Sequence, residues 1–328
     1  MPSDRYISIL KQGGRIAAEN FYPDKQYIST SVSGPGAGKK HIFLRIKNTL
    51  LRLEIDNNSE FSIWRDRDCY NIRYMGKIIL ENVVIEPVAG HCPNNLYITV
   101  GESCILGCHF CEIKSGTESI KSFDRLVSIT EKYINDIHSV GLTSGYLGNH
   151  KEIDTIISYI EWFKKHHNIP VGVSVYPYSF SDIADIKKAG ADEFKLNIEF
   201  YERELFEKIC PGKDYDFILE LLDESVRVFG KNRVSSNLIV GAGEHIDTIK
   251  KCLEDFAKKG IIVNLREFKY SQRLKQKIEN ITGREIIPLD YKTKIDIALF
   301  KKNIEKKYKL NSKQLRTLCA GCGACDIL

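Results

Sequence analysis

The sequence predicts an α/β protein in which a parallel sheet curls into a full or partial barrel. After about residue 95, short apolar strands alternate with amphipathic helical segments in six successive units. Such units form parallel sheets with right-handed crossovers. The first 90 residues or so instead alternate apolar and polar residues between turn formers, which is typical of a small antiparallel sheet. At 328 residues the chain can bury a large core.

The N-terminal segment contains five predicted strands, at residues 27–32, 42–46, 51–55, 61–64 and 71–74. Residues 33–40 are glycine-rich and superficially similar to a phosphate-binding loop. The segment is one residue short between its glycines and lacks a hydroxyl after Lys39, so it predicts a flexible loop instead. Cys69 is expected in the core, because free cysteine buries readily.

The later region contains six predicted strands, at residues 95–100, 140–143, 171–176, 193–198, 234–240 and 261–265. Helical spacing predicts helices at residues 123–137, 152–164, 181–190, 215–229 and 246–259. Thr130 is the one polar residue on the apolar face of the first helix. Ser181 is the expected N-cap of the third helix, and Gly190 marks its end.

Composition excludes some functional classes. The net charge of +5 does not mark a nucleic-acid binder, and no apolar run is long enough to span a membrane. The first residues lack a basic segment followed by an apolar one, so we expect a cytoplasmic protein. Ten cysteines are many for this length. In a cytosolic chain, clustered cysteines more often bind metal or catalyse than form disulfides.

The first cysteine cluster follows the strand at residues 95–100. Cys104, Cys108 and Cys111 have the spacing C-x3-C-x2-C and lie on the loop at the carboxyl end of that strand, where parallel barrels place their active sites. Thiolates favour iron–sulfur clusters, zinc or copper(I). Zinc structural sites need four protein ligands, whereas three leave one metal corner open for substrate or cofactor. A zinc knuckle or three unrelated buried cysteines are the alternatives.

A second cluster, Cys319, Cys322 and Cys325, ends the chain, and small residues between the cysteines let the backbone wrap tightly. We expect a second iron–sulfur cluster here, with a zinc site or a disordered tail as alternatives. Cys92 precedes the first barrel strand. A buried thiol is the favoured interpretation of Cys92, and an extra ligand for a second cluster is the other.

The stretch from Cys104 to Cys111 resembles the motif of the radical S-adenosylmethionine (SAM) superfamily, including the aromatic Phe110 before the last cysteine. The resemblance implies a partial (β/α)6 barrel and a [4Fe-4S] cluster on these cysteines, with SAM chelated by the fourth iron. It also implies three parts of the chain. They are an N-terminal β-rich domain at 1–90, a radical SAM core at 91–285, and a C-terminal helix with an auxiliary-cluster tail at 286–328.

Several segments after the strands resemble lipoyl synthases, and one also resembles biotin synthases. In those families the corresponding segments bind SAM, and glycines let the backbone approach it closely. Leu196 stands where the families have histidine and Cys210 where lipoyl synthases have arginine, so those two roles are not transferred. The resemblance assigns SAM binding to Phe110, Thr143, Ser144, Gly145, Asn197, Glu199, Ser236, Asn237, Gly241, Gly243 and Glu244.

The implied activity is reductive cleavage of SAM to a 5′-deoxyadenosyl radical, followed by sulfur insertion at an unactivated carbon. The second cluster would donate the sulfur, the substrate would be an octanoyl chain on a lysine of a lipoyl carrier domain, and ferredoxin or flavodoxin would supply electrons. Common lipoyl synthases place three auxiliary cysteines before the barrel. That pattern is absent here, so the archaeal-type enzymes, which act as a pair of radical SAM proteins, are more similar.

Two alternatives stay open. One is a biotin synthase-like methylase, a rearrangement enzyme or a peptide-modifying radical SAM enzyme. The other is a non-catalytic metal-cluster scaffold.

Overall fold

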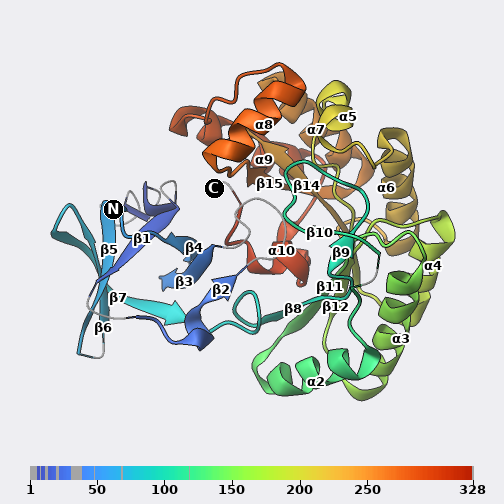
Figure 1. The fold of residues 1–328 in the computed structure, drawn as a ribbon, viewed down its shortest axis with the longest axis horizontal. Helices are drawn as coiled ribbons and strands as arrows, with labels where there is room; N and C mark the ends of the chain where they lie inside the picture. The colour runs from blue at the N-terminus through green and yellow to red at the C-terminus, as the bar shows by residue number, and fades with distance from the viewer. Residues whose placement is uncertain are drawn as a thin grey trace.

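The structure is a computed structural model that describes residues 6–7, 9–11, 14–19, 22–30, 39–47, 49–67, 69–117 and 119–326. In this part of the chain, a seven-stranded N-terminal sheet faces a six-stranded parallel sheet, and helices cover the outer side of the parallel sheet (Figure 1). No helix among these residues has the length and apolar character needed to cross a membrane.

The N-terminal sheet is closed and mixed, so the prediction of a purely antiparallel sheet was wrong. Its strands are β1 (Arg15–Glu19), β2 (Ser29–Thr30), β3 (Lys40–Ile46), β4 (Thr49–Ile55), β5 (Phe61–Asp66), β6 (Cys69–Tyr74) and β7 (Lys77–Glu86). Strand β1 lies between β4 and β5 and is parallel to both, and β7 pairs with β3 to close the sheet. Closure removes most exposed strand edges and surrounds a core that includes Ile16, Leu44 and Ile63.

Two further N-terminal predictions need correction. Cys69 is exposed rather than buried, because it starts β6 beside a turn and pairs with the exposed end of β5 at Asp66. The predicted strand at 27–32 begins later, since Lys25–Tyr27 forms a 3-10 helix (η1) before β2. Residues 31–38, with most of the predicted flexible loop, lie outside the described residues.

The parallel sheet confirms the predicted partial barrel. Its strands are β8 (Asn95–Thr99), β11 (Ser139–Thr143), β12 (Val171–Ser174), β13 (Glu193–Lys195), β14 (Val234–Val240) and β15 (Ile261–Glu267). Their spatial order follows their order in the sequence, and every neighbouring pair is parallel. Strand β13 ends three residues earlier than predicted. Beyond it, Glu199 (φ 58°) forms only an isolated parallel bridge with Leu238 of β14.

The predicted helices of this region are also present. The helices are α2 (Phe123–Tyr133), α3 (Lys151–His166), α4 (Phe180–Ala189), α5 (Arg203–Ile209), α6 (Tyr215–Phe229), α7 (Ile246–Lys259), α8 (Gln272–Thr282), α9 (Tyr291–Lys307) and α10 (Leu318–Cys322). Thr130 is buried, as its position on the apolar face predicts. The N-cap of α4 is Ser179 rather than Ser181, because the Asp182 carboxylate accepts a hydrogen bond from the Ser179 N–H (3.1 Å).

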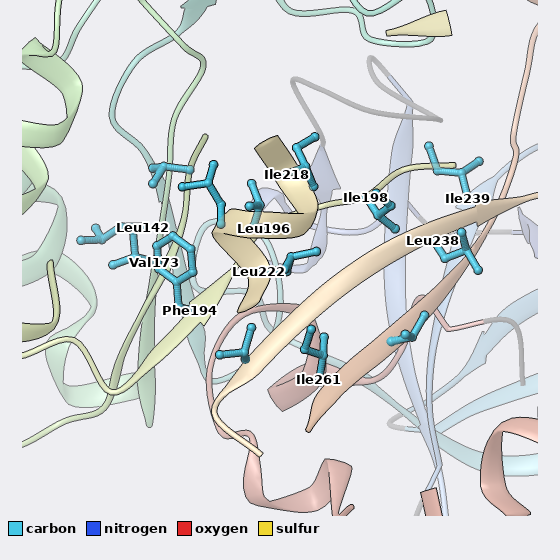
Figure 2. Packing of buried hydrophobic residues seen from close by; sticks show 14 of the residues in the cluster. Leu142, Val173, Phe194, Leu196, Ile198, Ile218, Leu222, Leu238, Ile239 and Ile261 are labelled. Carbon is cyan, nitrogen blue, oxygen red and sulfur yellow. The ribbon is translucent and has the colours of Figure 1, made fainter. Parts of the chain in front are cut away.

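The main core lies between the parallel sheet and its outer helices. Figure 2 shows Val173 of β12 beside Phe194 of β13 with Leu222 of α6 nearby, and Leu238 of β14 farther along the sheet beside Ile239. Because side chains alternate along a strand, the remaining positions face the inside of the barrel. There the strands carry small or polar residues instead of apolar ones, which leaves room inside the barrel.

The C-terminal segment occupies that room. Helix α10 lies on the concave side of the parallel sheet, between it and the N-terminal sheet (Figure 1). Asn95 at the start of β8 donates its side-chain N–H to the Leu318 carbonyl (2.9 Å), and Ala324 packs against Phe43 of β3. The end of the chain therefore contacts both sheets.

Candidate functional site

The first cysteine cluster lies on the loop after β8, as predicted. The loop contains the short strand β9 (Ser103–Cys104), which pairs with β10 (Lys114–Ser115). All three cysteines, Cys104, Cys108 and Cys111, are half-buried. Thiols at this position can face the carboxyl ends of the strands while the surrounding loop limits access of water.

Backbone contacts from two other segments hold the cysteine loop in place. Ile105 N–H donates to the Tyr146 carbonyl (3.0 Å) and His109 N–H to the Ile209 carbonyl (2.9 Å). A Cβ at Gly145 would overlap the Ser103 carbonyl oxygen, so only glycine permits this close approach. The loop is thus positioned by the segment after β11 and by the carboxyl end of α5.

Two donors approach the sulfurs of this loop. The Tyr146 N–H donates to Cys104 Sγ (3.4 Å). A hydrogen bond from the buried Cys210 thiol lowers the pKa of Cys108, and the nearby Lys213 charge adds to this effect against the opposing effect of burial. These contacts favour the thiolate form, which is the form that ligates iron.

A buried ion pair lies beside the loop. Lys213 Nζ is 2.9 Å from Glu199 Oε1, and both side chains are at most 10 % exposed. Burial by itself lowers the pKa of Lys213. The Glu199 carboxylate and the nearby cysteines raise it by more, so the net pKa is above the ordinary lysine value and the ammonium group stays charged. The carboxylate of Glu199 therefore has a fixed counter-charge at the carboxyl end of β13.

The other residues assigned to SAM binding fall into two groups. Thr143, Ser144 and Asn197 lie at strand ends near the cysteine loop, where Ser144 Oγ accepts the Gly101 N–H (2.9 Å) and Asn197 Oδ1 accepts the Asn237 N–H (3.2 Å). The second group makes contacts within the protein itself. Phe110 packs against the ring of Phe200, and Ser236 Oγ accepts the Ile198 N–H. The Glu244 carboxylate accepts the N–H groups of Gly241 and Ala242 in its own loop, next to Gly243.

The donor set at the first loop fits an iron–sulfur cluster. Among the residues described, no group of three or more His, Cys, Asp or Glu side chains is arranged to hold a metal ion. A multinuclear cluster spreads its thiolate ligands over several irons. Three thiols on one loop, with a backbone N–H donor at Cys104 and the charge of Lys213 near Cys108, match that requirement.

The second cysteine cluster is enclosed, not a free tail. The Tyr97 hydroxyl and Lys195 Nζ each lie 3.2 Å from Cys319 Sγ, and Arg52 Nη1 lies 3.9 Å from Cys325 Sγ. These three side chains come from β8, β13 and β4. Both sheets therefore contribute to this site, which sequence reasoning treated as an independent C-terminal segment.

The electrostatics of this enclosure favour bound thiolates. Although burial raises it, the charges of Lys195 and Arg266 lower the pKa of Cys319 to about 6. Arg266 forms an ion pair with Asp326, and its Nη2 is buried without a hydrogen-bond partner in the described part of the chain. A buried donor left without a partner is costly, and sulfides of an anionic cluster would satisfy it. The residues therefore fit such a cluster.

A buried carboxylate anchors the segment before α10. Glu193 Oε1 accepts the Arg316 N–H (2.8 Å), and Oε2 accepts the Thr317 N–H (2.9 Å) and hydroxyl (2.5 Å). A Cβ at Gly172 of β12 would overlap the Thr317 hydroxyl, so only glycine at this position lets the C-terminal segment lie directly against the strand. Sequence reasoning missed this anchor because Glu193 and Thr317 are far apart in the chain.

Replacing Glu193 with glutamine is expected to loosen the C-terminal segment, because the neutral amide accepts through only one of its two terminal atoms. Leaving buried donors unpaired costs roughly 1–3 kcal/mol each. We expect faster limited proteolysis between residues 310 and 320 and fewer irons bound per chain. Glu220→Gln, an exposed change on α6, is the control. Unchanged proteolysis and iron content in Glu193→Gln would contradict the anchoring role.

Acid is expected to destabilise the N-terminal sheet through His41. Burial and the charge of Arg52 lower the pKa of His41 to about 3, so protons bind this residue more strongly in the unfolded chain. The contribution of His41 to the free energy of unfolding is present above about pH 6.5 and is lost as the pH falls towards 3. About 2 kcal/mol of this free energy is lost between pH 7 and pH 5. Denaturant midpoints at both pH values should show a smaller loss for His41→Gln than for the wild type and for the exposed control His138→Gln. Equal losses in all three would refute the assignment.

Comparison with known proteins agrees with this geometry. Residues 98–256 match the model of the radical SAM superfamily. The lipoyl synthase of Corynebacterium jeikeium (strain K411) is 28 % identical over 174 residues, which are 50 % of this chain and 48 % of that protein. The probable GTP 3′,8-cyclase of Thermoplasma volcanium is 23 % identical over 193 residues, 57 % of each chain. The matches thus span about half the length of these relatives.

The fold is also similar to that of a solved structure. The FeFe-hydrogenase maturase HydG from Carboxydothermus hydrogenoformans matches with a TM-score of 0.51 at 14 % identity, over 65 % of this chain and 52 % of that chain. At this identity the match supports the fold alone.

Proposed function

Residues 98–256 form a radical SAM domain, and we propose that this protein is a radical SAM enzyme that inserts sulfur at unactivated C–H carbons, converting an octanoyl-lysyl carrier to its lipoyl form. Lipoyl synthases at 26–28 % identity support this assignment. A [4Fe-4S] cluster and SAM, when bound, supply the reducing equivalent and the radical for hydrogen abstraction. The second cysteine cluster would hold the sulfur source.

The observation that carries the proposal is that β13 and the segment directly after it contact both cysteine clusters. Lys195, the last residue of β13, donates to Cys319 of the second cluster. Four residues later, Glu199 forms its ion pair with Lys213, whose charge acts on Cys108 of the first cluster. A substrate carbon held between the two sites would be within the same barrel, shielded from water by both sheets.

The residues of the chain have separable roles in this proposal. Cys104, Cys108 and Cys111 would hold the first cluster, and Glu199 with Asn197 would orient SAM through polar contacts. Lys213 forms an ion pair with the Glu199 carboxylate and would hold it in position. The second cluster would be held by Cys319, Cys322 and Cys325, with Lys195, Arg266 and Arg52 balancing its negative charge.

The partners follow from the same assignment. A lipoyl carrier domain would present the octanoyl-lysine, and the N-terminal sheet would help to dock it. Ferredoxin or flavodoxin would supply electrons. A paired radical SAM protein, as in the archaeal-type lipoyl synthases that the sequence resembles, would share the reaction.

The direct test is an anaerobic assay with reconstituted protein, SAM, reductant and an octanoyl-lysyl carrier domain. Mass spectrometry of the carrier should show sulfur gained and hydrogen lost at the octanoyl chain. An octanoyl-lysyl peptide without the carrier domain tests whether the domain is needed. SAM cleavage without any sulfur-containing product, from a protein that holds both clusters, would refute sulfur insertion.

A second candidate comes from the GTP 3′,8-cyclases among the relatives. In this alternative the second cluster holds an anionic substrate, and the cationic side chains Lys195, Arg266 and Arg52 contact it. GTP would then bind to the reconstituted protein, and SAM cleavage would give a cyclised nucleotide instead of a thiolated acyl chain. Equilibrium binding of GTP to wild type and to Lys195→Met separates the two candidates.

A further inference from the structure

We infer that Cys92 is a fourth cysteine ligand of the second site, which makes that site a closed four-thiolate set. The inference rests on the proposal that Cys319, Cys322 and Cys325 hold a cluster. Cys92 comes from the segment between the two sheets, more than 220 residues before the other three in the sequence. The structure places its side chain in a buried cluster with Phe43 and Ala324, and Cys322 packs against this cluster.

Two independent contacts hold Cys92 at this place. The turn around it is closed by the Ala89 N–H, which donates to the Cys92 carbonyl (3.1 Å), and by the Cys92 thiol, which lies 3.5 Å from the Asn95 carbonyl. Asn95 in turn donates its side-chain N–H to the Leu318 carbonyl (2.9 Å) at the start of α10. The turn that carries Cys92 is therefore tied directly to the helix that carries Cys319 and Cys322.

Apolar side chains surround Cys92 on one side, and positively charged side chains lie near the neighbouring cysteines on the other. Its side chain is 1 % exposed and packs with Phe43 and Ala324. Beyond Cys322, the site contains Cys319 with Lys195 and Arg266 beside it. Another buried cysteine, Cys252, lies instead in the main core on α7. Unlike Cys252, Cys92 lies near a second cysteine, Cys322, in a site that also contains the cations Lys195 and Arg266.

Four cysteines are the usual complete ligand set of a [2Fe-2S] or [4Fe-4S] cluster. With Cys92 included, each iron of a cubane at the second site has a protein ligand. The site then has no iron corner open to a small ligand, unlike the three-cysteine site on the loop after β8. This coordination argues against direct binding of a substrate to the second cluster and separates the two candidate functions.

The experiment uses the full-length chain carrying Cys104→Ala, Cys108→Ala and Cys111→Ala, so that only the second site can hold iron. This parent is compared with the same chain carrying Cys92→Ala, Cys92→Ser or, as the matched buried control, Cys252→Ala. Each is reconstituted anaerobically and assayed for iron and sulfide. Electron paramagnetic resonance of the reduced proteins is recorded with and without cyanide as a small exogenous ligand.

We expect about four irons in the parent and a spectrum that cyanide leaves unchanged. Cys92→Ala should lose iron or become cyanide-sensitive, Cys92→Ser should keep iron with a shifted spectrum, and Cys252→Ala should match the parent. A Cys92→Ala spectrum identical to the parent's and insensitive to cyanide would overturn the inference while leaving the cluster in place. A cyanide-sensitive parent would overturn it too.

A parent without iron would overturn the second cluster itself, and with it the role of Cys92. Loss of folding is recognised separately. In the chain with an intact first loop, Cys92→Ala should still form 5′-deoxyadenosine from SAM, which requires a folded barrel. If that activity is kept while iron at the second site changes, the effect belongs to the second site.

Discussion

Replacing Cys108 with alanine is expected to reduce the formation of 5′-deoxyadenosine from SAM to background. Cys108 lies on the loop after β8, receives a hydrogen bond from Cys210 and is close to the charge of Lys213. Loss of one of only three ligands on this loop leaves an iron without its thiolate. The effect should exceed the roughly 10–100-fold that loss of an outer-shell partner costs. Chromatographic quantification of 5′-deoxyadenosine under reducing, anaerobic conditions measures it.

Two further cysteine variants make this result specific. Cys69→Ala changes an exposed cysteine of the N-terminal sheet and should leave the rate unchanged. Cys210→Ala removes the hydrogen bond to Cys108 and should give an intermediate loss of about 10–100-fold. Wild-type rates of SAM cleavage in Cys108→Ala would remove the first loop from the mechanism and would favour the non-catalytic scaffold.

Replacing Cys319 with alanine is expected to keep SAM cleavage and to abolish sulfur insertion. Cys319 lies between Tyr97 and Lys195 inside the barrel, away from the loop that carries the first cluster. Removal of Cys319, Cys322 and Cys325 together should lower the iron content from about eight to about four per chain. Iron and acid-labile sulfide, measured with the product assay on the same samples, link cluster loss to loss of sulfur transfer.

The outcomes of this second experiment discriminate between the candidate functions. Sulfur insertion that persists in Cys319→Ala would show that the second site is not the donor. About four irons in both wild type and the triple variant would mean that the tail holds no cluster. In that case a methylase or rearrangement reaction at the first site becomes the better proposal.

Local patterns in the sequence were enough to predict most of the barrel. The period of apolar residues predicted helix α6 at Tyr215–Phe229 and helix α7 at Ile246–Lys259 with their observed bounds. Glycine at the end of three predicted helices (Gly190, Gly230 and Gly260) and the cysteine spacing near Cys104 are likewise local features. They succeed because helix and strand formation depends on residues a few positions apart, and the order of such elements restricts a parallel sheet to few topologies.

The position of β1 illustrates what local patterns omit. The short segment from Arg15 to Glu19 carries no clear alternation, and only pairing with β4 and β5 makes it a strand. Its parallel orientation then converts the expected antiparallel sheet into a closed mixed one.

The sequence by itself determined the barrel, the two cysteine triads and the positions of Glu199 and Asn197 at a strand end. The tertiary structure alone decided that the tail enters the barrel, that Lys213 pairs with Glu199, and that Cys92 packs near Cys322. These contacts join residues 14 to 230 positions apart. No local period encodes them, because they depend on which buried charges and polar groups find partners once both sheets have closed around the C-terminal segment.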